Sequence, residues 1–218
     1  MKPYKAFLFD LNGTMIDDME YHIVAWHGIL NKLGAGISLA QMKEECYGKN
    51  TELLERMFPN RFSDEEKDAM SYEKEKHYQR AFAPKLKLID GLHDFLDEAH
   101  IAGIKMAIGS AAIMFNIDFV LDGLDIRKYF DVIVSADDVT DSKPDPETYL
   151  QCAAKLGIDP KDCLVFEDVP KGVEAAMNAN MDAVVITTMH HKEEFENCSN
   201  VISFIDNYHD GSLTKLIQ

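Results

Sequence analysis

The sequence has few cysteines and no long apolar run. Four cysteines occur in 218 residues, with no CxxC pair and no regular spacing: Cys46, Cys152, Cys163 and Cys198. With no secretion signal beside them, we expect buried, reduced thiols. No apolar stretch approaches the roughly 20 residues of a membrane span, and the stretch before Asp10 is too short for a signal-peptide core. These absences predict a cytoplasmic protein without a membrane partner.

Positive charge is also scarce. Lysine and arginine number 22 against 38 aspartates and glutamates, which gives a formal net charge of −16. Nucleic acid binding requires a basic surface, so we expect no nucleic-acid partner. If the substrate is a phosphate ester, its pocket must overcome this negative background locally, with a metal ion, a lysine and backbone N–H groups.

Short apolar segments predict the strands of a buried parallel sheet. They lie at Ala6–Phe9, Lys105–Gly109, Val132–Ser135, Cys163–Glu167 and Ala183–Thr187. Helical patterns alternate with the later strands, at Asp90–Ala102, Pro146–Leu156 and Lys171–Asn180. Such alternation predicts an α/β fold in which helices flank a parallel sheet on both faces.

The segment Met19–Lys85 breaks this alternation. It contains no convincing strand and several helical patterns, at Tyr21–Leu33, Leu39–Tyr47, Thr51–Met57 and Asp64–Phe82. Pro59 and Pro84 interrupt the helices. We expect an all-helical insert after the first strand, and two lobes in one chain usually place a ligand site in the cleft between them.

Polar side chains follow the predicted strands at the edge where open parallel sheets bind ligands. They are Asp10 in Asp-Leu-Asn-Gly-Thr, Ser110, Lys143 in Ser-Lys-Pro-Asp-Pro, and Glu167 with Asp168. A carboxylate can attack phosphorus and form an aspartyl-phosphate, and three carboxylates offer the hard oxygens that Mg²⁺ prefers. A lysine and a hydroxyl can hold the phosphoryl oxygens. Each residue alone would more often be a cap, a turn or a surface residue, so the prediction rests on their joint order.

These ordered motifs resemble those of the haloacid dehalogenase superfamily. The segment Glu20–Trp26, with His22 twelve residues after Asp10, resembles the β-phosphoglucomutase-like subfamily. The resemblance implies a Rossmann-like core of residues 1–17 and 87–218 and a helical cap domain of residues 18–86. It also implies phosphoryl transfer through a covalent phosphate on Asp10.

The same resemblance implies a role for each site residue. Asp10 is the nucleophile and a Mg²⁺ ligand, together with Asp168, Glu167 and the main-chain carbonyl of Asn12. Ser110 and Lys143 bind the phosphoryl group, joined by the main chain at Leu11 and Ala111. His22 either lies over the site when the cap closes or is a packing residue beside Trp26, which we interpret as cap-helix packing.

Asn12 departs from the pattern. Active members of the superfamily usually carry an aspartate there that protonates the leaving group, and an amide cannot do this. Metal and phosphate binding should survive while turnover falls. The sequence does not decide whether Asn12 is natural or engineered.

The substrate side departs as well. Thr51 stands where a cap arginine of β-phosphoglucomutases would align, and Ala111–Met114 offers no polar side chain after Ser110. A bisphosphate intermediate would therefore find little to bind, unless Lys49 or Arg56 substitutes.

We therefore predict a monomeric, Mg²⁺-dependent hydrolase of a small phosphorylated metabolite, a sugar phosphate or pyrophosphate. A phosphomutase and a metabolite-binding protein without turnover are the alternatives. A receiver domain is disfavoured by the helical insert.

Overall fold

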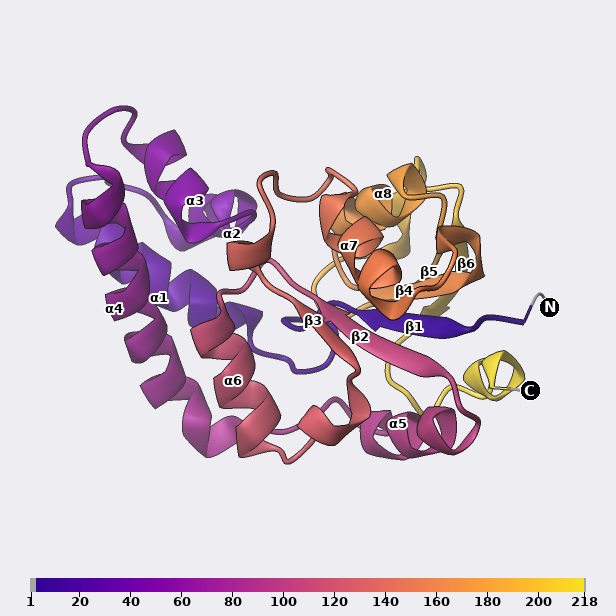
Figure 1. The fold of residues 1–218 in the computed structure, drawn as a ribbon. Helices are drawn as coiled ribbons and strands as arrows, with labels where there is room; N and C mark the ends of the chain where they lie inside the picture. The colour runs from indigo at the N-terminus through magenta and orange to yellow at the C-terminus, as the bar shows by residue number, and fades with distance from the viewer. Residues whose placement is uncertain (1–2, 218) are drawn as a thin grey trace. The chain divides into compact units, whose positions relative to one another are not determined.

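The chain folds as two compact units in the computed structural model, which describes residues 3–217 (Figure 1). One unit comprises residues 1–17 and 87–218, and the other comprises residues 18–86. The first contains the sheet. In the second, every regular element is a helix.

A six-stranded parallel sheet forms the centre of the first unit, with the strand order β3-β2-β1-β4-β5-β6. Its strands are β1 (Ala6–Phe9), β2 (Lys105–Gly109), β3 (Val132–Val134), β4 (Cys163–Glu167), β5 (Asp182–Ile186) and β6 (Val201–Ile205). The predicted α/β fold is confirmed. The sixth strand was missed because it is mostly half-buried, with Ile202 exposed, Ser203 at its centre and only Ile205 buried, unlike the continuous apolar runs of the inner strands.

Helices cover both faces of this sheet (Figure 1). They include α5 (Leu92–Ile101), α7 (Glu147–Leu156) and α8 (Pro170–Asn178), and the same unit also contains α6 (Met114–Gly123). Helix α7 contacts β1, β2 and β3, whereas α8 contacts β4 and β5. Helix α5 contacts β2 and lies on the opposite face. The sequence analysis did not predict α6, which begins without a side-chain cap.

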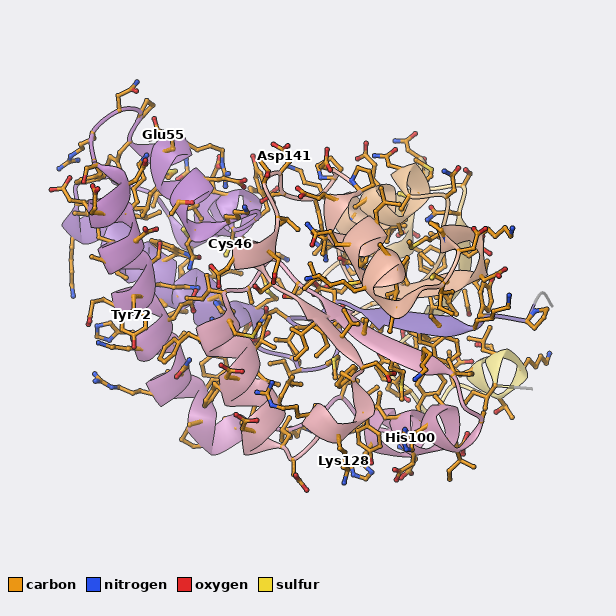
Figure 2. The ribbon with its side chains drawn as sticks, viewed as in Figure 1. Cys46, Glu55, Tyr72, His100, Lys128 and Asp141 are labelled. Atoms are coloured by element: carbon orange, nitrogen blue, oxygen red, sulfur yellow. The ribbon has the colours of Figure 1, made fainter. Side chains whose placement is uncertain are left out.

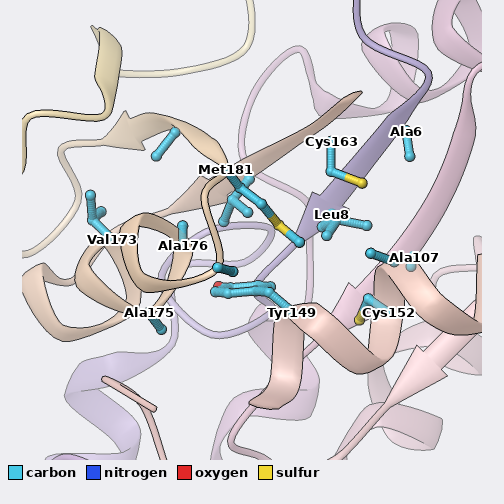
Figure 3. Packing of buried hydrophobic residues seen from close by; sticks show 14 of the residues in the cluster. Ala6, Leu8, Ala107, Tyr149, Cys152, Cys163, Val173, Ala175, Ala176 and Met181 are labelled. Atoms are coloured by element: carbon cyan, nitrogen blue, oxygen red, sulfur yellow. The ribbon is translucent and has the colours of Figure 1, made fainter. Parts of the chain in front are cut away.

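Strand β1 shows why the inner strands read as continuous apolar segments. Ala6 and Leu8 join the cluster that packs beneath α7 and α8 (Figure 3). The alternate residues Phe7 and Phe9 instead stack with aromatic rings that include Phe95 and Phe166. Because successive side chains point to opposite faces and both faces are covered, every residue of β1 is buried.

The all-helical unit contains α1 (Met19–Lys32), α2 (Leu39–Glu45), α3 (Asn50–Met57), α4 (Asp64–Phe82) and the short 3₁₀ helix η1 (Ala83–Lys85). Ser38 and Ser63 begin α2 and α4 with capping boxes, in which the serine and the third helical residue satisfy each other's main-chain N–H groups. Helix α4 packs against α1 and α3. Trp26 of α1 is buried within the unit, in agreement with a packing role.

All four cysteines are free thiols. Cys152 and Cys163 are buried as expected, but Cys46 and Cys198 are only half-buried. The expectation was wrong for these two because they lie at the end of α2 (Figure 2) and in the loop before β6, not within the sheet core. In residues 3–217, no helix combines the length and apolar character that crossing a bilayer requires.

Candidate active site

The register of the sheet brings three of the sequence-predicted groups to one edge. Strand β1 pairs with β2 on one side and β4 on the other, and Phe9 lies opposite Phe166. The residues that follow, Asp10 after β1 and Glu167 at the end of β4, are therefore neighbours. Ser110 follows β2 at the same edge. Carboxyl ends of adjacent parallel strands form the usual ligand site of such sheets.

Lys143 joins two of these strand ends. Its Nζ donates hydrogen bonds to Asp10 Oδ1 at 2.7 Å, to Glu167 Oε1 at 2.7 Å and to the hydroxyl of Tyr149 at 2.9 Å. Burial lowers the pKa of this ammonium, but the two carboxylates outweigh burial and raise the pKa above its ordinary value. Lys143 is therefore a fixed positive charge beside Asp10.

Asp10, Glu167 and Asp168 form a buried acidic cluster whose ligand atoms all lie within 4.8 Å of one another. Asp168 Oδ1 accepts a hydrogen bond from Thr14, whereas its buried Oδ2 has no hydrogen-bond partner. Burial and then the charges of Glu167 and Asp10 raise the pKa of Asp168 well above the ordinary value. Three carboxylates and the Lys143 ammonium leave two negative charges when all are ionised, so the donor set suits a divalent cation with oxygen ligands.

The carboxylates of Glu167, the last residue of β4, and of Asp168, which follows it, are not equivalent. Glu167 Oε1 accepts from Lys143 and Tyr149, and Oε2 accepts from the main-chain N–H groups of Asp168 and Val169. Both oxygens of Glu167 are thus occupied within the protein, whereas Asp168 keeps one oxygen for another partner. The arrangement favours Asp168 over Glu167 as a direct metal ligand.

A tight turn after β1 holds Asp10 beside Asp168. Gly13 has a φ of +77°, a left-handed conformation that favours glycine, and a Cβ there would stand 2.1 Å from Asp168 Oδ2. Both the backbone conformation and the lack of room for a side chain therefore require glycine at this position. The main-chain N–H of Met15 donates to the carbonyl of Leu11, whose side chain is buried. Asn12 is half-buried in this turn.

Ser110 is buried, and its Oγ accepts a hydrogen bond from the N–H of Ala112 at 3.1 Å. Ala111 is half-buried, as are the residues that follow up to Met114. This segment therefore presents main-chain groups and apolar side chains.

His22 lies in the helical unit, within a buried polar cluster. Its Nδ1 is 2.5 Å from Lys74 Nζ, and its Nε2 is 3.2 Å from Asp18 Oδ2. Because an ammonium can only donate, Nδ1 accepts and Nε2–H donates to Asp18. The ring also stacks on Tyr78 at 3.8 Å between centroids. These contacts bury His22 within the helical unit, and both its packing role and its position over a bound phosphate stay predictions.

Arg56, one residue that could replace the missing cap arginine, is held within the helical unit. Its guanidinium donates to the main-chain carbonyls of Glu45 and Tyr47 and stacks over the Tyr47 ring at 3.9 Å. It also pairs with the Glu45 carboxylate. These contacts occupy the Nε and Nη2 groups of Arg56. Lys49 and Thr51 lie at the start of α3.

Sequence reasoning missed three residues that shape the acidic cluster. Thr14 binds Asp168, Tyr149 binds Lys143 and Glu167, and Gly172 gives the Glu167 carboxylate its space. Thr14 is the last residue of the Asp-Leu-Asn-Gly-Thr segment that follows β1. Tyr149 and Gly172 gave no signal, because an aromatic residue early in a helix is ordinarily a core residue and a helical glycine suggests only tight packing.

Comparison with known proteins gives consistent matches. A family model of haloacid dehalogenase-like hydrolases matches residues 7–186. The chain is 30% identical over 181 residues to a fructose-1-phosphate phosphatase from Escherichia coli, covering 83% of this chain and 95% of that protein. It is 31% identical over 188 residues to a β-phosphoglucomutase from Bacillus subtilis, covering 83% and 82%. A crystal structure of β-phosphoglucomutase from Clostridium difficile superposes with a TM-score of 0.84 at 28% identity, covering 98% of this chain and 96% of that one.

Proposed function

The chain belongs to the haloacid dehalogenase-like hydrolases, and from that premise we propose that it hydrolyses a small sugar phosphate through an aspartyl-phosphate on Asp10. The observation that carries this proposal is the position of Lys143 Nζ, 2.7 Å from both Asp10 and Glu167. The names of the Escherichia coli and Bacillus subtilis relatives support a phosphorylated sugar as the substrate class.

The first half-reaction forms an Asp10–phosphorus bond and breaks the bond between phosphorus and the leaving oxygen. The Asp10 carboxylate supplies the attacking electron pair, and the leaving alkoxide takes a proton from solvent water. In the second half-reaction, a water oxygen forms a bond to the same phosphorus while the bond between phosphorus and the Asp10 oxygen breaks. The attacking water gives its proton to solvent, and inorganic phosphate and the Asp10 carboxylate are released. Lys143 and Ser110 hold the phosphoryl oxygens while negative charge spreads over them.

We propose Mg²⁺ as the cofactor. Asp10, Asp168 and the main-chain carbonyl of Asn12 would hold it, with Glu167 keeping Lys143 in place. When bound, the ion neutralises the acidic cluster and polarises the phosphoryl oxygens.

Asn12 sets the expected rate. Its amide cannot protonate the leaving oxygen or take a proton from water, and a positioned acid–base group contributes about 10²–10⁴-fold in rate. The test is phosphate release from a panel of sugar phosphates and pyrophosphate, by this chain and by Asn12→Asp in parallel. We expect Asn12→Asp to be faster by two orders of magnitude or more, and Asp10→Asn in that background to be inactive.

A second candidate is a metabolite-binding protein without turnover, which Asn12 itself favours. If neither this chain nor the Asn12→Asp variant releases phosphate, and a sugar phosphate binds tightly, the metabolite-binding protein is supported over the hydrolase.

A further inference from the structure

The hydroxyl of Tyr149 lies where Lys143 meets Glu167. It accepts a hydrogen bond from Lys143 Nζ at 2.9 Å and donates one to Glu167 Oε1 at 2.9 Å. Tyr149 is fully buried, and the side chain of Lys143 is 8% exposed. The contact is thus screened from water, which makes each of its hydrogen bonds stronger than at a surface.

Packing does not account for this hydroxyl. The Tyr149 ring lies in the apolar cluster beneath α7 and α8, among side chains that include Cys152 and Met181 (Figure 3). The same ring lies 4.7 Å from Lys143 Nζ. A phenylalanine would keep all of these ring contacts. A buried hydroxyl is unfavourable unless it is hydrogen-bonded. The Tyr149 oxygen is therefore accounted for by its hydrogen bonds with Lys143 and Glu167, not by packing.

The three donors of the Lys143 ammonium have three acceptors: Asp10 Oδ1, Glu167 Oε1 and the Tyr149 oxygen. Of these, the tyrosine is the neutral one. It directs one N–H without adding negative charge, and it shares Glu167 Oε1 with the lysine. Glu167 Oε1 thus accepts from both the tyrosine and the ammonium, while the ammonium keeps one N–H directed at Asp10 Oδ1.

We propose that Tyr149 is a positioning residue for phosphoryl transfer, which keeps the Lys143 ammonium aimed at the phosphate carried on Asp10. This inference rests on the proposed function, because it assigns Lys143 to the transferring phosphoryl group. Tyr149 acts through Lys143 and Glu167 and does not itself touch the phosphate.

The test compares Tyr149→Phe with Tyr129→Phe, both in the Asn12→Asp background. Tyr129 is a matched control, because it is also buried in the same unit and its hydroxyl donates to a carboxylate, Asp97, outside the site. We expect Tyr149→Phe to lower kcat by about 10- to 100-fold, the loss for one hydrogen bond to a charged group. KM should change less, because a misaimed ammonium harms the transition state more than substrate binding. Tyr129→Phe should leave kcat unchanged.

A double-mutant cycle separates positioning from a general structural effect. In a Lys143→Met background, Tyr149→Phe should cause no further loss, because the group that it positions is absent. Equal kcat values for Tyr149→Phe and Tyr129→Phe, or the same loss with and without Lys143, would overturn the inference while leaving the hydrolase intact.

If the Asn12→Asp parent releases no phosphate, the proposed function fails and binding decides the matter. Calorimetric titration with inorganic phosphate and Mg²⁺ should then show severalfold weaker binding for Tyr149→Phe than for Tyr129→Phe. Equal affinities would overturn the role of Tyr149.

Discussion

Thr14 and Asp168 are 154 positions apart in the sequence, yet Thr14 Oγ1 donates a hydrogen bond of 3.1 Å to Asp168 Oδ1. This bond fixes the Asp168 carboxylate, and its second oxygen remains buried without a hydrogen-bond partner. A buried acceptor of this kind is unfavourable unless a cation or a donor satisfies it. Thr14 thus fixes one oxygen of Asp168 and leaves the other for the proposed metal ion.

Asp168→Asn tests the metal site. We expect wild-type protein to gain about 5–10 °C in Tm at a Mg²⁺ concentration of about 100 times Kd, since such binding contributes about 2.7 kcal/mol. The asparagine can still accept from Thr14 but lacks the charge, so the gain should disappear. Thermal unfolding with and without Mg²⁺ measures this. Asp131→Asn, which alters a carboxylate paired with Lys105 elsewhere, should keep the gain. An unchanged Mg²⁺ effect in Asp168→Asn would place the metal elsewhere.

The raised pKa of Asp168 gives a pH dependence in metal-free buffer. The ordinary value is 3.8, so the unfolded chain loses this proton near pH 4 while the folded protein keeps it to higher pH. Across that window the folded state binds more protons, and the free energy of unfolding falls as the pH rises, by about 1.4 kcal/mol per pH unit. Denaturant unfolding should therefore show wild type losing stability relative to Asp168→Asn as the pH rises above about 4. If the free energy of unfolding changed with pH in parallel for the two proteins, the raised pKa of Asp168 would be contradicted.

The sequence predicted the inner strands because both faces of the sheet are covered, which makes each strand a continuous apolar run. It predicted the strand-end acids because parallel strands end at one edge. It could not predict β6, whose exposed residue Ile202 resembles a surface position. Nor could it predict the bond from Thr14 to Asp168 or from Tyr149 to Glu167, because these depend on side-chain directions across distant segments.

Gly172 carries a further prediction. A Cβ there would stand 1.8 Å from Glu167 Oε1. Glu167 cannot move aside without losing its contacts with Lys143 and Tyr149. Gly172→Ala should therefore displace the carboxylate, and we expect at least a tenfold loss of phosphatase activity in the Asn12→Asp background, together with about 1–3 kcal/mol of destabilisation from overpacking.

Gly28→Ala is the matched control, because that glycine lies in α1 with nothing within 4 Å of the added Cβ. It should be stabilising by up to about 1 kcal/mol through helix propensity and leave activity unchanged. Phosphate assays and urea unfolding on both variants measure the difference. Full activity in Gly172→Ala would mean that Glu167 need not hold its observed position.

The last prediction separates hydrolase from mutase. A mutase releases a bisphosphate, turns it and rebinds it by its other phosphate, so it needs two strong anion sites. The proposed first site has Lys143, Ser110 and the acidic cluster, with the metal ion proposed for that cluster. For a second phosphate site, the segment after Ser110 supplies only apolar side chains. Within the helical unit, Arg56 Nη2 donates hydrogen bonds to the main-chain carbonyls of Glu45 and Tyr47. Hydrogen bonds to charged groups contribute about 1.5–3 kcal/mol each, so lacking two or three weakens binding by about two orders of magnitude or more.

We therefore expect the Asn12→Asp protein to release phosphate from β-glucose 1-phosphate or another sugar phosphate faster than it forms glucose 6-phosphate. A coupled assay for glucose 6-phosphate, primed with bisphosphate, run beside free-phosphate detection, gives the ratio. Mutase flux above phosphate release would contradict the hydrolase, and Lys49→Ala would then test whether Lys49 supplies the second site. Arg56→Lys offers a separate check: if Arg56 serves only the helical unit, the change should lower Tm and leave the ratio of the two products unaltered.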